Sequence, residues 1–264
     1  MGNFLRDFVM TRLEAPRRNY ERRIYNDMAH LLRTVQPGDV ILVEGRSELS
    51  RIIQLLSNST WTHAAMYVGD RLVRPDAPQR ETVQGRFGKD ARHLVVEAFV
   101  GEGVIVSPLR KYQEDNIRLC RPYEISEDDR EQVIDGVVAN LGKHYDEQNI
   151  IDLALMLLPL GLNPFKNKTI KACLGGCNDF RVICSGMIAR SFQKVGYPIV
   201  PALQPRLGAV PAPVDNPYGS RLAMRHFSQV LPRDFDISPN FEIIKFNVIG
   251  KPFDYRSLWM DAKP

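Results

Sequence analysis

The chain has 264 residues, of which 44% are hydrophobic and 25% charged, and this composition excludes a largely disordered protein. The longest apolar segment, residues 150–162, includes Asp152 and Pro159 and is too short for a membrane-spanning helix. The net charge of +4 and a pI near 8.9 are mildly basic, but no ribonucleoprotein motif or zinc-finger spacing accompanies them, so no nucleic-acid partner is expected.

The chain begins with apolar residues at roughly helical spacing, which predicts an N-terminal helical extension over residues 3–35 with a break near Pro16. Residues 12–23 carry much of the positive charge. They predict a solvated helix face, and peripheral contact with an anionic membrane is the alternative. The first ten residues lack the features of a secretion signal, so a cytoplasmic location with free thiols is expected.

The next part of the chain alternates short β-branched runs with turn signals. A Pro-Gly turn precedes the first run, and Ser47 is placed to cap the helix that follows. In the second run, His63 shares one face with Ala65 and Tyr67. The predicted elements are a strand in 36–45, a helix at 47–58, a strand at 61–70, a loop at 71–92 and a hairpin at 93–109.

The second half predicts more helix. Ser126 and the acidic residues after it are typical of a helix start, and Gly142 is typical of a helix end. The predicted elements are a strand at 116–123, helices at 126–142 and 146–160, a loop at 166–180, a helix from Cys184 to about Val195, and an edge strand at 241–250.

We therefore expect a helical extension over residues 1–35 and one domain over residues 36–264. Within that domain, residues 197–219 contain six prolines and show little periodicity. A stiff irregular segment of this length predicts a cover over the active-site cleft, or a surface wrap that seals apolar core.

Cys184 is the candidate nucleophile. At a helix start, unsatisfied backbone N–H groups and the helix dipole favour its thiolate. Of the five histidines, only His63 lies inside a strand among small and apolar residues. Glu97 lies in the apolar run VVEAF, where a buried carboxylate needs a partner. A His63–Glu97 pair would satisfy both groups and leave one imidazole nitrogen for the sulfur.

The order of strand histidine, strand glutamate and helix cysteine resembles the circularly permuted papain-like amidases of the NlpC superfamily (YaeF/YiiX-like), which are distantly related to lecithin retinol acyltransferase. The resemblance lies in five motifs: PGDVILVEG, THAAMYVGD, VVEA, GKHYD and ICSGMIARSF. A weaker likeness lies in PRDFDISPNFEIIKF. Ser-Gly-Met follows Cys184 where many relatives have Ser-Glu-Leu, which bears on substrate preference.

This resemblance implies a permuted papain-like α+β fold, with an antiparallel sheet or barrel packed against helices. It further implies a cysteine hydrolase or acyltransferase that needs no cofactor and cleaves an amide or ester of a small-molecule, lipid or peptide substrate. The implied roles are nucleophile for Cys184, base for His63 and orienting acid for Glu97. Ser185 and Tyr145 are candidates for substrate or oxyanion contacts, and Tyr145 could equally be a packing residue.

Three other interpretations stay open. The spacing of Cys173 and Cys177 could indicate a metal site completed by Cys184 and His144, but only one such pair is present and no metal is expected. The same two thiols could instead oxidise to a disulfide. The fold could also serve a non-catalytic lipid or peptide binder, or a peptidoglycan peptidase, which would need access to the cell envelope.

Overall fold

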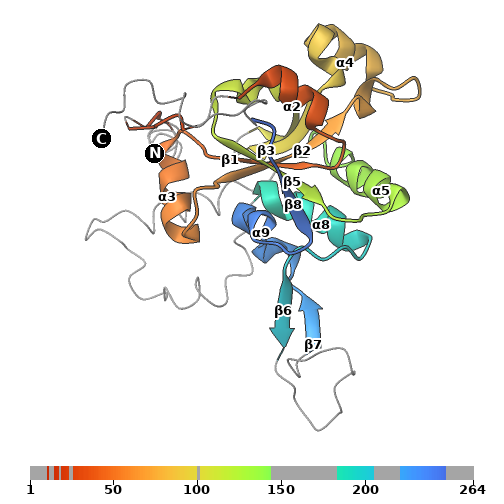
Figure 1. Cartoon of the computed structure of the whole chain (residues 1–264). Helices are drawn as coiled ribbons and strands as arrows, with labels where there is room; N and C mark the ends of the chain where they lie inside the picture. Colours follow the sequence, from red (N-terminus) through yellow and green to blue (C-terminus); the bar gives the residue numbers. More distant parts are fainter. Residues whose placement is uncertain are drawn as a thin grey trace, which may run out of the picture.

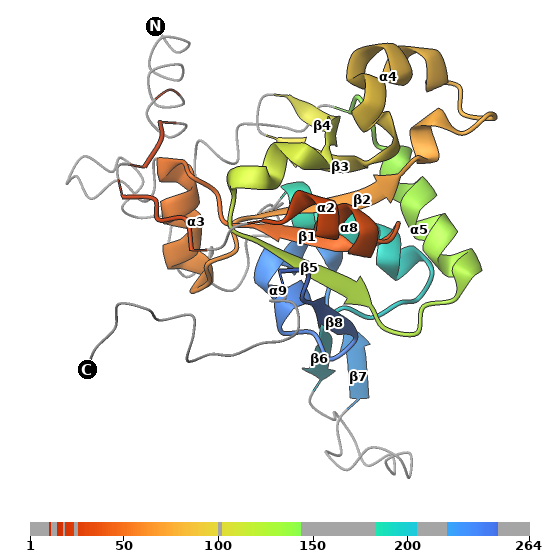
Figure 2. The same cartoon turned by 45° about the horizontal axis from the view of Figure 1, so that its top comes forward.

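A computed structural model describes Thr11 and residues 15–17, 19–23, 26–99, 102–143, 183–204 and 221–247. Its centre is an open six-stranded sheet with helices on both faces (Figures 1 and 2). The strands are β1 (Val40–Val43), β2 (His63–Gly69), β3 (Leu94–Phe99), β4 (Gly103–Pro108), β5 (Ile117–Pro122) and β8 (Phe241–Ile244). The predicted α+β fold with an antiparallel sheet is confirmed, and the sheet does not close into a barrel.

The sheet has the strand order β4-β3-β2-β1-β5-β8, and every neighbouring pair is antiparallel. In this register, Val43 pairs with His63 and Ala65 pairs with Glu97. The two predicted active-site residues are therefore on adjacent strands near the centre of the sheet. The predicted edge strand is also confirmed, because β8 pairs with β5 alone.

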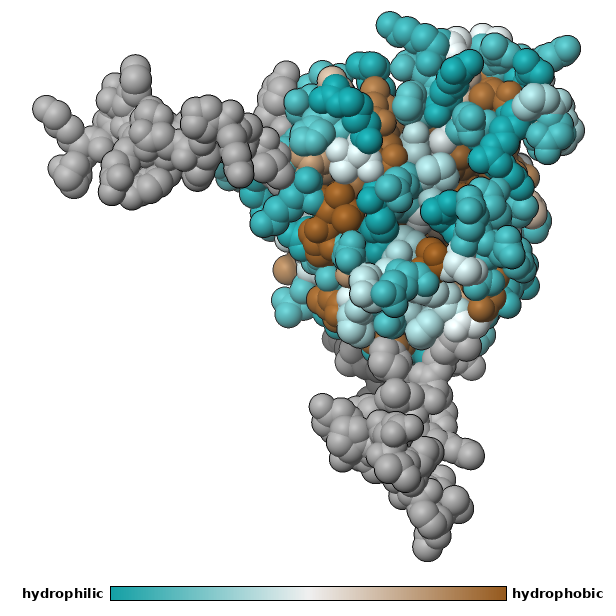
Figure 3. Space-filling view, turned by 45° about the vertical axis from the view of Figure 1, so that its right-hand side comes forward, coloured by the Kyte–Doolittle hydropathy of each residue, from teal (hydrophilic) through white to brown (hydrophobic). Residues whose placement is uncertain are grey.

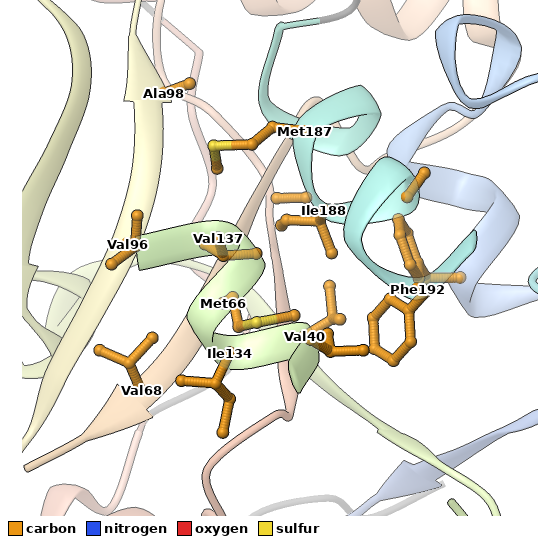
Figure 4. Packing of buried hydrophobic residues seen from close by; sticks show 14 of the residues in the cluster. Val40, Met66, Val68, Val96, Ala98, Ile134, Val137, Met187, Ile188 and Phe192 are labelled. Atoms are coloured by element: carbon orange, nitrogen blue, oxygen red, sulfur yellow. The ribbon is translucent and has the colours of Figure 1, made fainter. Parts of the chain in front are cut away.

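Each face of the sheet has its own apolar cluster. On one face, Ala64, Met66 and Val68 of β2 pack with α5 (Glu127–Val138) and α8 (Ile183–Lys194) (Figure 4). On the other face, Ala65 and Tyr67 pack with α2 (Met28–Thr34). This alternation along β2 is the one that the sequence predicts.

Several predicted helix boundaries are confirmed. α3 (Glu48–Ser57) begins after Ser47, whose side chain accepts a hydrogen bond from the backbone N–H of Ser50. The predicted helix at 126–142 is shorter than expected, because α5 ends at Val138 and turns follow. Gly142 then adopts a φ of 76°, which suits glycine after a helix.

Ser126 caps α5, because its hydroxyl oxygen accepts a hydrogen bond from the backbone N–H of Asp129 at 3.1 Å. We expect Ser126→Ala to lower the free energy of unfolding by about 1 kcal/mol, because the N–H loses its acceptor. Urea denaturation of the two proteins measures this difference. Ser126→Asp supplies another acceptor, so its free energy of unfolding should fall much less. An equal fall in both variants would contradict a capping role.

Two parts of the chain differ from the predicted secondary structure. The predicted break near Pro16 is confirmed, because residues 15–17 are not helical; the expected helix is wrong for residues 19–23, which are not helical either, and α2 begins only at Met28. Tertiary hydrogen bonds explain this: Arg17 N–H donates to the Arg46 carbonyl and Arg23 N–H to the Asn116 side chain. α2 packs on the sheet, while the division of the chain at residue 35 stays a prediction.

The expected loop at residues 71–92 is also wrong. It contains α4 (Arg80–Phe87) and two 3-10 helices, η1 (Arg71–Val73) and η2 (Gly88–Arg92). The sequence of α4 is almost entirely polar, and Val83 is its one buried residue, so there was little apolar periodicity to reveal the helix.

After α8 the chain forms a two-stranded ribbon of β6 (Pro201–Gln204) and β7 (Arg221–Met224), which extends away from the sheet in Figure 1. Part of the expected irregular segment 197–219 is therefore a strand. Residues 205–219 lie outside the described part of the chain, as do the predicted helix 146–160 and loop 166–180. The covering role of residues 197–219 stays a prediction.

Three short elements complete the described part of the chain: the 3-10 helices η3 (Leu109–Glu114) and η4 (Phe227–Gln229), and α9 (Pro232–Asp236). Within the described ranges, no helix is both long and apolar enough to cross a membrane. The face shown in Figure 3 is mostly hydrophilic, with small separate apolar patches.

Candidate active site

His63 and Glu97 form a side-chain pair across β2 and β3. Both project from the sheet face that carries Ala65 and Tyr67, and His63 Nε2 lies 3.0 Å from Glu97 Oε2. The side chain of Glu97 is fully buried, and that of His63 is 14% exposed. Because Nε2 faces the carboxylate, Nδ1 is the imidazole nitrogen available to another partner.

Cys184 lies in the first turn of α8 and is 6% exposed. Its sulfur is hydrogen-bonded to His63 and to the backbone N–H groups of Ala64 and Ser185. One of these donors belongs to the start of β2 and the other to the start of the helix. The structure therefore brings Cys184, His63 and Glu97 together in one chain of polar contacts.

These contacts change the protonation of all three groups. Burial acts to lower the pKa of His63, but the charge of Cys184 and hydrogen bonds to Cys184 and Glu97 raise that pKa to about 9. Burial acts to raise the pKa of the Cys184 thiol, but the imidazolium charge and three hydrogen bonds hold that pKa below its ordinary value. The arrangement favours a thiolate–imidazolium pair at neutral pH.

Glu97 has two further partners that the sequence did not reveal. Lys111 Nζ lies 2.5 Å from Oε1, and the hydroxyl of Tyr112 donates to Oε2. Burial acts to raise the pKa of Glu97, but His63 and Lys111 outweigh it and lower that pKa to about 2. Both partners lie in η3, which no sequence pattern predicted.

Phe99 contacts both His63 and Lys111. Its ring stacks on the imidazole of His63, with centroids 4.7 Å apart, and the Lys111 ammonium lies 4.5 Å from its centroid. An aromatic face attracts cations and limits rotation of the imidazole. Its location at the end of β3, two residues after Glu97, is the only sequence signal that could have suggested this contact.

Of the two candidates for oxyanion contacts, the structure describes Ser185 but not Tyr145. Ser185 is fully buried, and its hydroxyl donates to the carbonyl of Val230 at 2.7 Å, so the side chain is already used within the fold. Only its backbone N–H is directed at the site. Tyr145 lies outside the described residues, and so does His144. Their roles stay predictions.

A family model described as permuted papain-like amidase enzyme, YaeF/YiiX, C92 family, matches residues 34–152. The resemblance to permuted papain-like amidases is confirmed. The matched segment includes His63, Glu97 and Lys111, and Cys184 lies beyond it. The match supports a cysteine hydrolase of the amidase or peptidase type.

One similar solved structure is described as metalloprotein yiiX from Escherichia coli O157:H7. It is 18% identical, with a TM-score of 0.45, and the similarity covers 80% of this chain and 97% of that one. No curated protein matches the chain.

The remaining cysteines differ from Cys184. Cys120 is buried in the sheet, and burial raises the pKa of its thiol well above the ordinary value. Cys173 and Cys177 lie outside the described residues. Among the residues that the structure describes, no group of three or more His, Cys, Asp or Glu side chains is placed to hold a metal ion.

Proposed function

We propose that the protein is a cysteine hydrolase that cleaves an amide or ester bond through a thioester acyl-enzyme. The observation that carries the proposal is the polar chain from the Cys184 sulfur through His63 to the buried Glu97. This chain supplies a thiolate, a proton donor beside it and a carboxylate that fixes the imidazole, as nucleophilic catalysis requires. The amidase family match supports the same chemistry.

In the proposed reaction, the Cys184 thiolate attacks the substrate carbonyl carbon and a C–S bond forms. The His63 imidazolium then donates its proton to the departing amine or alcohol as the C–N or C–O bond breaks. Neutral His63 next takes a proton from water, which attacks the thioester and releases the acid and the thiolate. Glu97 stays ionised throughout and orients the imidazole.

We propose water as the acyl acceptor, since the family match supports hydrolysis and not transfer to another acceptor. The proposed substrate class is a small molecule, lipid or peptide with an amide or ester carbonyl. The backbone N–H of Ser185 and the side chain of Tyr145 are proposed contacts to the oxyanion.

Selective alkylation tests the reactive thiol without knowledge of the substrate. Treated with iodoacetamide at pH 6, Cys184 should react at least about 100-fold faster than Cys120, because only a thiolate is nucleophilic. Peptide mass spectrometry over a time course gives the rate at each cysteine. Cys184→Ala should leave the Cys120 rate unchanged. Equal rates at the two thiols in the folded protein would contradict the proposal.

A further inference from the structure

A hollow of about 460 Å³ lies between the chain that follows α3 and helix α9. One wall is the turn that leads into β2, and the opposite wall is formed by α9 and the residue after it. A strand residue of β5 closes the hollow. The lining residues are Asn58, Ser59, Thr60, Trp61, Arg118, Arg233, Asp236 and Ile237.

The hollow carries a surplus positive charge. Arg118 forms an ion pair with Asp236, which also accepts a hydrogen bond from the Trp61 indole N–H at 2.9 Å. The guanidinium of Arg118 lies over the Trp61 ring, 5.1 Å from its centroid. Arg233 has no carboxylate within ion-pairing distance among the described residues. The lining of the hollow therefore contains two arginines and one carboxylate, which is paired with Arg118.

Unsatisfied polar atoms lie on Arg233, which lines the hollow, and on Ser57, which contacts Arg233 behind the lining. Among the described residues, three buried side-chain polar atoms have no hydrogen-bond partner, and two of them are Arg233 Nε and Ser57 Oγ. Arg233 also donates to the Ser57 carbonyl, so the two residues are in contact. Buried donors are rarely left unpaired in native proteins, and an anion with several oxygens would supply acceptors to this region.

Both walls of the hollow are joined to the active site over a few residues. Trp61 precedes His63 by two residues, a separation of at most about 7 Å along an extended chain. Arg233 follows Val230 by three residues, and the Val230 carbonyl binds the hydroxyl of Ser185, the neighbour of Cys184. These short connections tie both walls of the hollow to the elements that carry His63 and Cys184.

We propose that this hollow is a subsite for a carboxylate group of the substrate, with Arg233 as its principal cation. As a subsite for the reaction, it rests on the proposed function; as an anion-binding site, it does not. Planar guanidinium groups bind carboxylates through paired hydrogen bonds, and the hydroxyl groups of Ser59 and Thr60 offer further donors. The exposed side chain of Ile237 provides an apolar edge for the carbon chain.

Trp61 provides a direct readout, because its indole lines the hollow and the chain has only one other tryptophan, Trp259. In a Trp259→Phe background, titration with glutarate at constant ionic strength should change the fluorescence of Trp61 in a saturable manner. The neutral analogue glutaramide should not. Arg233→Gln should weaken glutarate binding at least about tenfold, since a charge-assisted hydrogen bond is lost.

Matched variants separate this effect from general changes in charge or folding. Arg51→Gln removes an exposed arginine of α3 that does not line the hollow, and it should leave binding unchanged. Ile237→Asp and Ile237→Asn differ by one charge at a residue that is 63% exposed, so both should fold, and only Ile237→Asp should weaken glutarate binding. No saturable change, equal binding of glutaramide, or equal effects of the two Ile237 variants would overturn the proposal.

A second measurement links the hollow to Cys184. Bromoacetamides with a terminal carboxylate should alkylate Cys184 faster than the same compounds with a terminal carboxamide, and Arg233→Gln should remove this preference. If Cys184 reacts with neither compound, the proposed function fails, while the glutarate titration still decides whether the hollow binds an anion. If it reacts equally with both, the hollow is not a subsite of the reaction.

Discussion

His63→Ala should lower the rate constant for alkylation of Cys184 at pH 6 by roughly 10- to 100-fold. Without the imidazolium, the buried thiol loses the charge that most lowers its pKa, and little thiolate is present at pH 6. The higher nucleophilicity of a more basic thiolate offsets part of this loss. Stopped incubations with iodoacetamide, followed by mass spectrometry of the Cys184 peptide, measure the rate.

The pH dependence makes this prediction specific. In the unaltered protein the rate should vary little with pH around neutrality, because the thiolate persists while His63 keeps its proton. In His63→Ala the rate should rise about tenfold per pH unit, until the thiol ionises on its own. His93→Ala is the control, since His93 contacts Tyr67 and not Cys184. A pH-independent rate in His63→Ala would contradict the ion pair.

Turnover of a substrate should add an alkaline limit. The pKa of His63 is raised to about 9, so imidazolium is present below that pH and is lost as the pH rises through it. In the proposed reaction the leaving group takes its proton from this imidazolium, so hydrolysis should decline above pH 9 even though the thiolate remains.

The sequence was sufficient for the parts of the site that depend on local chain geometry. Period-two alternation placed His63 on the correct face of β2, and the helix pattern after Cys184 predicted α8. Glu97 was recognisable because a carboxylate within an apolar strand requires a partner. Each of these signals lies within one element and does not depend on how the elements pack.

Contacts between distant elements were not predictable in this way. Lys111 and Tyr112 reach Glu97 because η3 folds back beside β3 and β4, and a 3-10 helix has no long periodic pattern to detect. The hollow at Trp61 likewise depends on α9, which lies more than 160 residues later in the sequence. Tertiary contacts also keep residues 19–23 out of the helix that their spacing predicted.

The chemical role of Glu97 depends on its balance with Lys111. Glu97 is an anion between two cations, and Lys111 neutralises part of the charge that would otherwise act on His63 alone. Other charged groups near this cluster are the Cys184 thiolate and Asp115, which is paired with Arg46. Removal of Glu97 makes the electrostatic potential at His63 more positive, and removal of Lys111 makes it more negative.

We expect Glu97→Gln and Lys111→Met to move the alkaline limit of turnover in opposite directions. Glu97→Gln removes the anion beside the imidazolium, so the pKa of His63 should fall by about one unit or more and the limit should move to lower pH. Lys111→Met removes the cation that is paired with Glu97, so the carboxylate acts more fully on the imidazolium. The pKa of the imidazolium should therefore rise, and the alkaline limit should move to higher pH.

The measurement for the alkaline limit is the pH profile of kcat/KM on any amide or ester substrate that the protein hydrolyses. The low-pH side of the profile, where the Cys184 thiol ionises, is measured by the rate of Cys184 alkylation. Lys111→Arg keeps the positive charge and should restore the original profile, and Lys89→Met, at an exposed residue outside the site, should not change it. Glu97→Gln should also cost less activity than His63→Ala, because the amide can still hydrogen-bond to the imidazole while no other group replaces the proton donor. If the alkaline limit moves in the same direction in Glu97→Gln and Lys111→Met, both residues act only on the fold. If it moves in opposite directions, Lys111 is a positioning residue that sets how strongly Glu97 acts on His63.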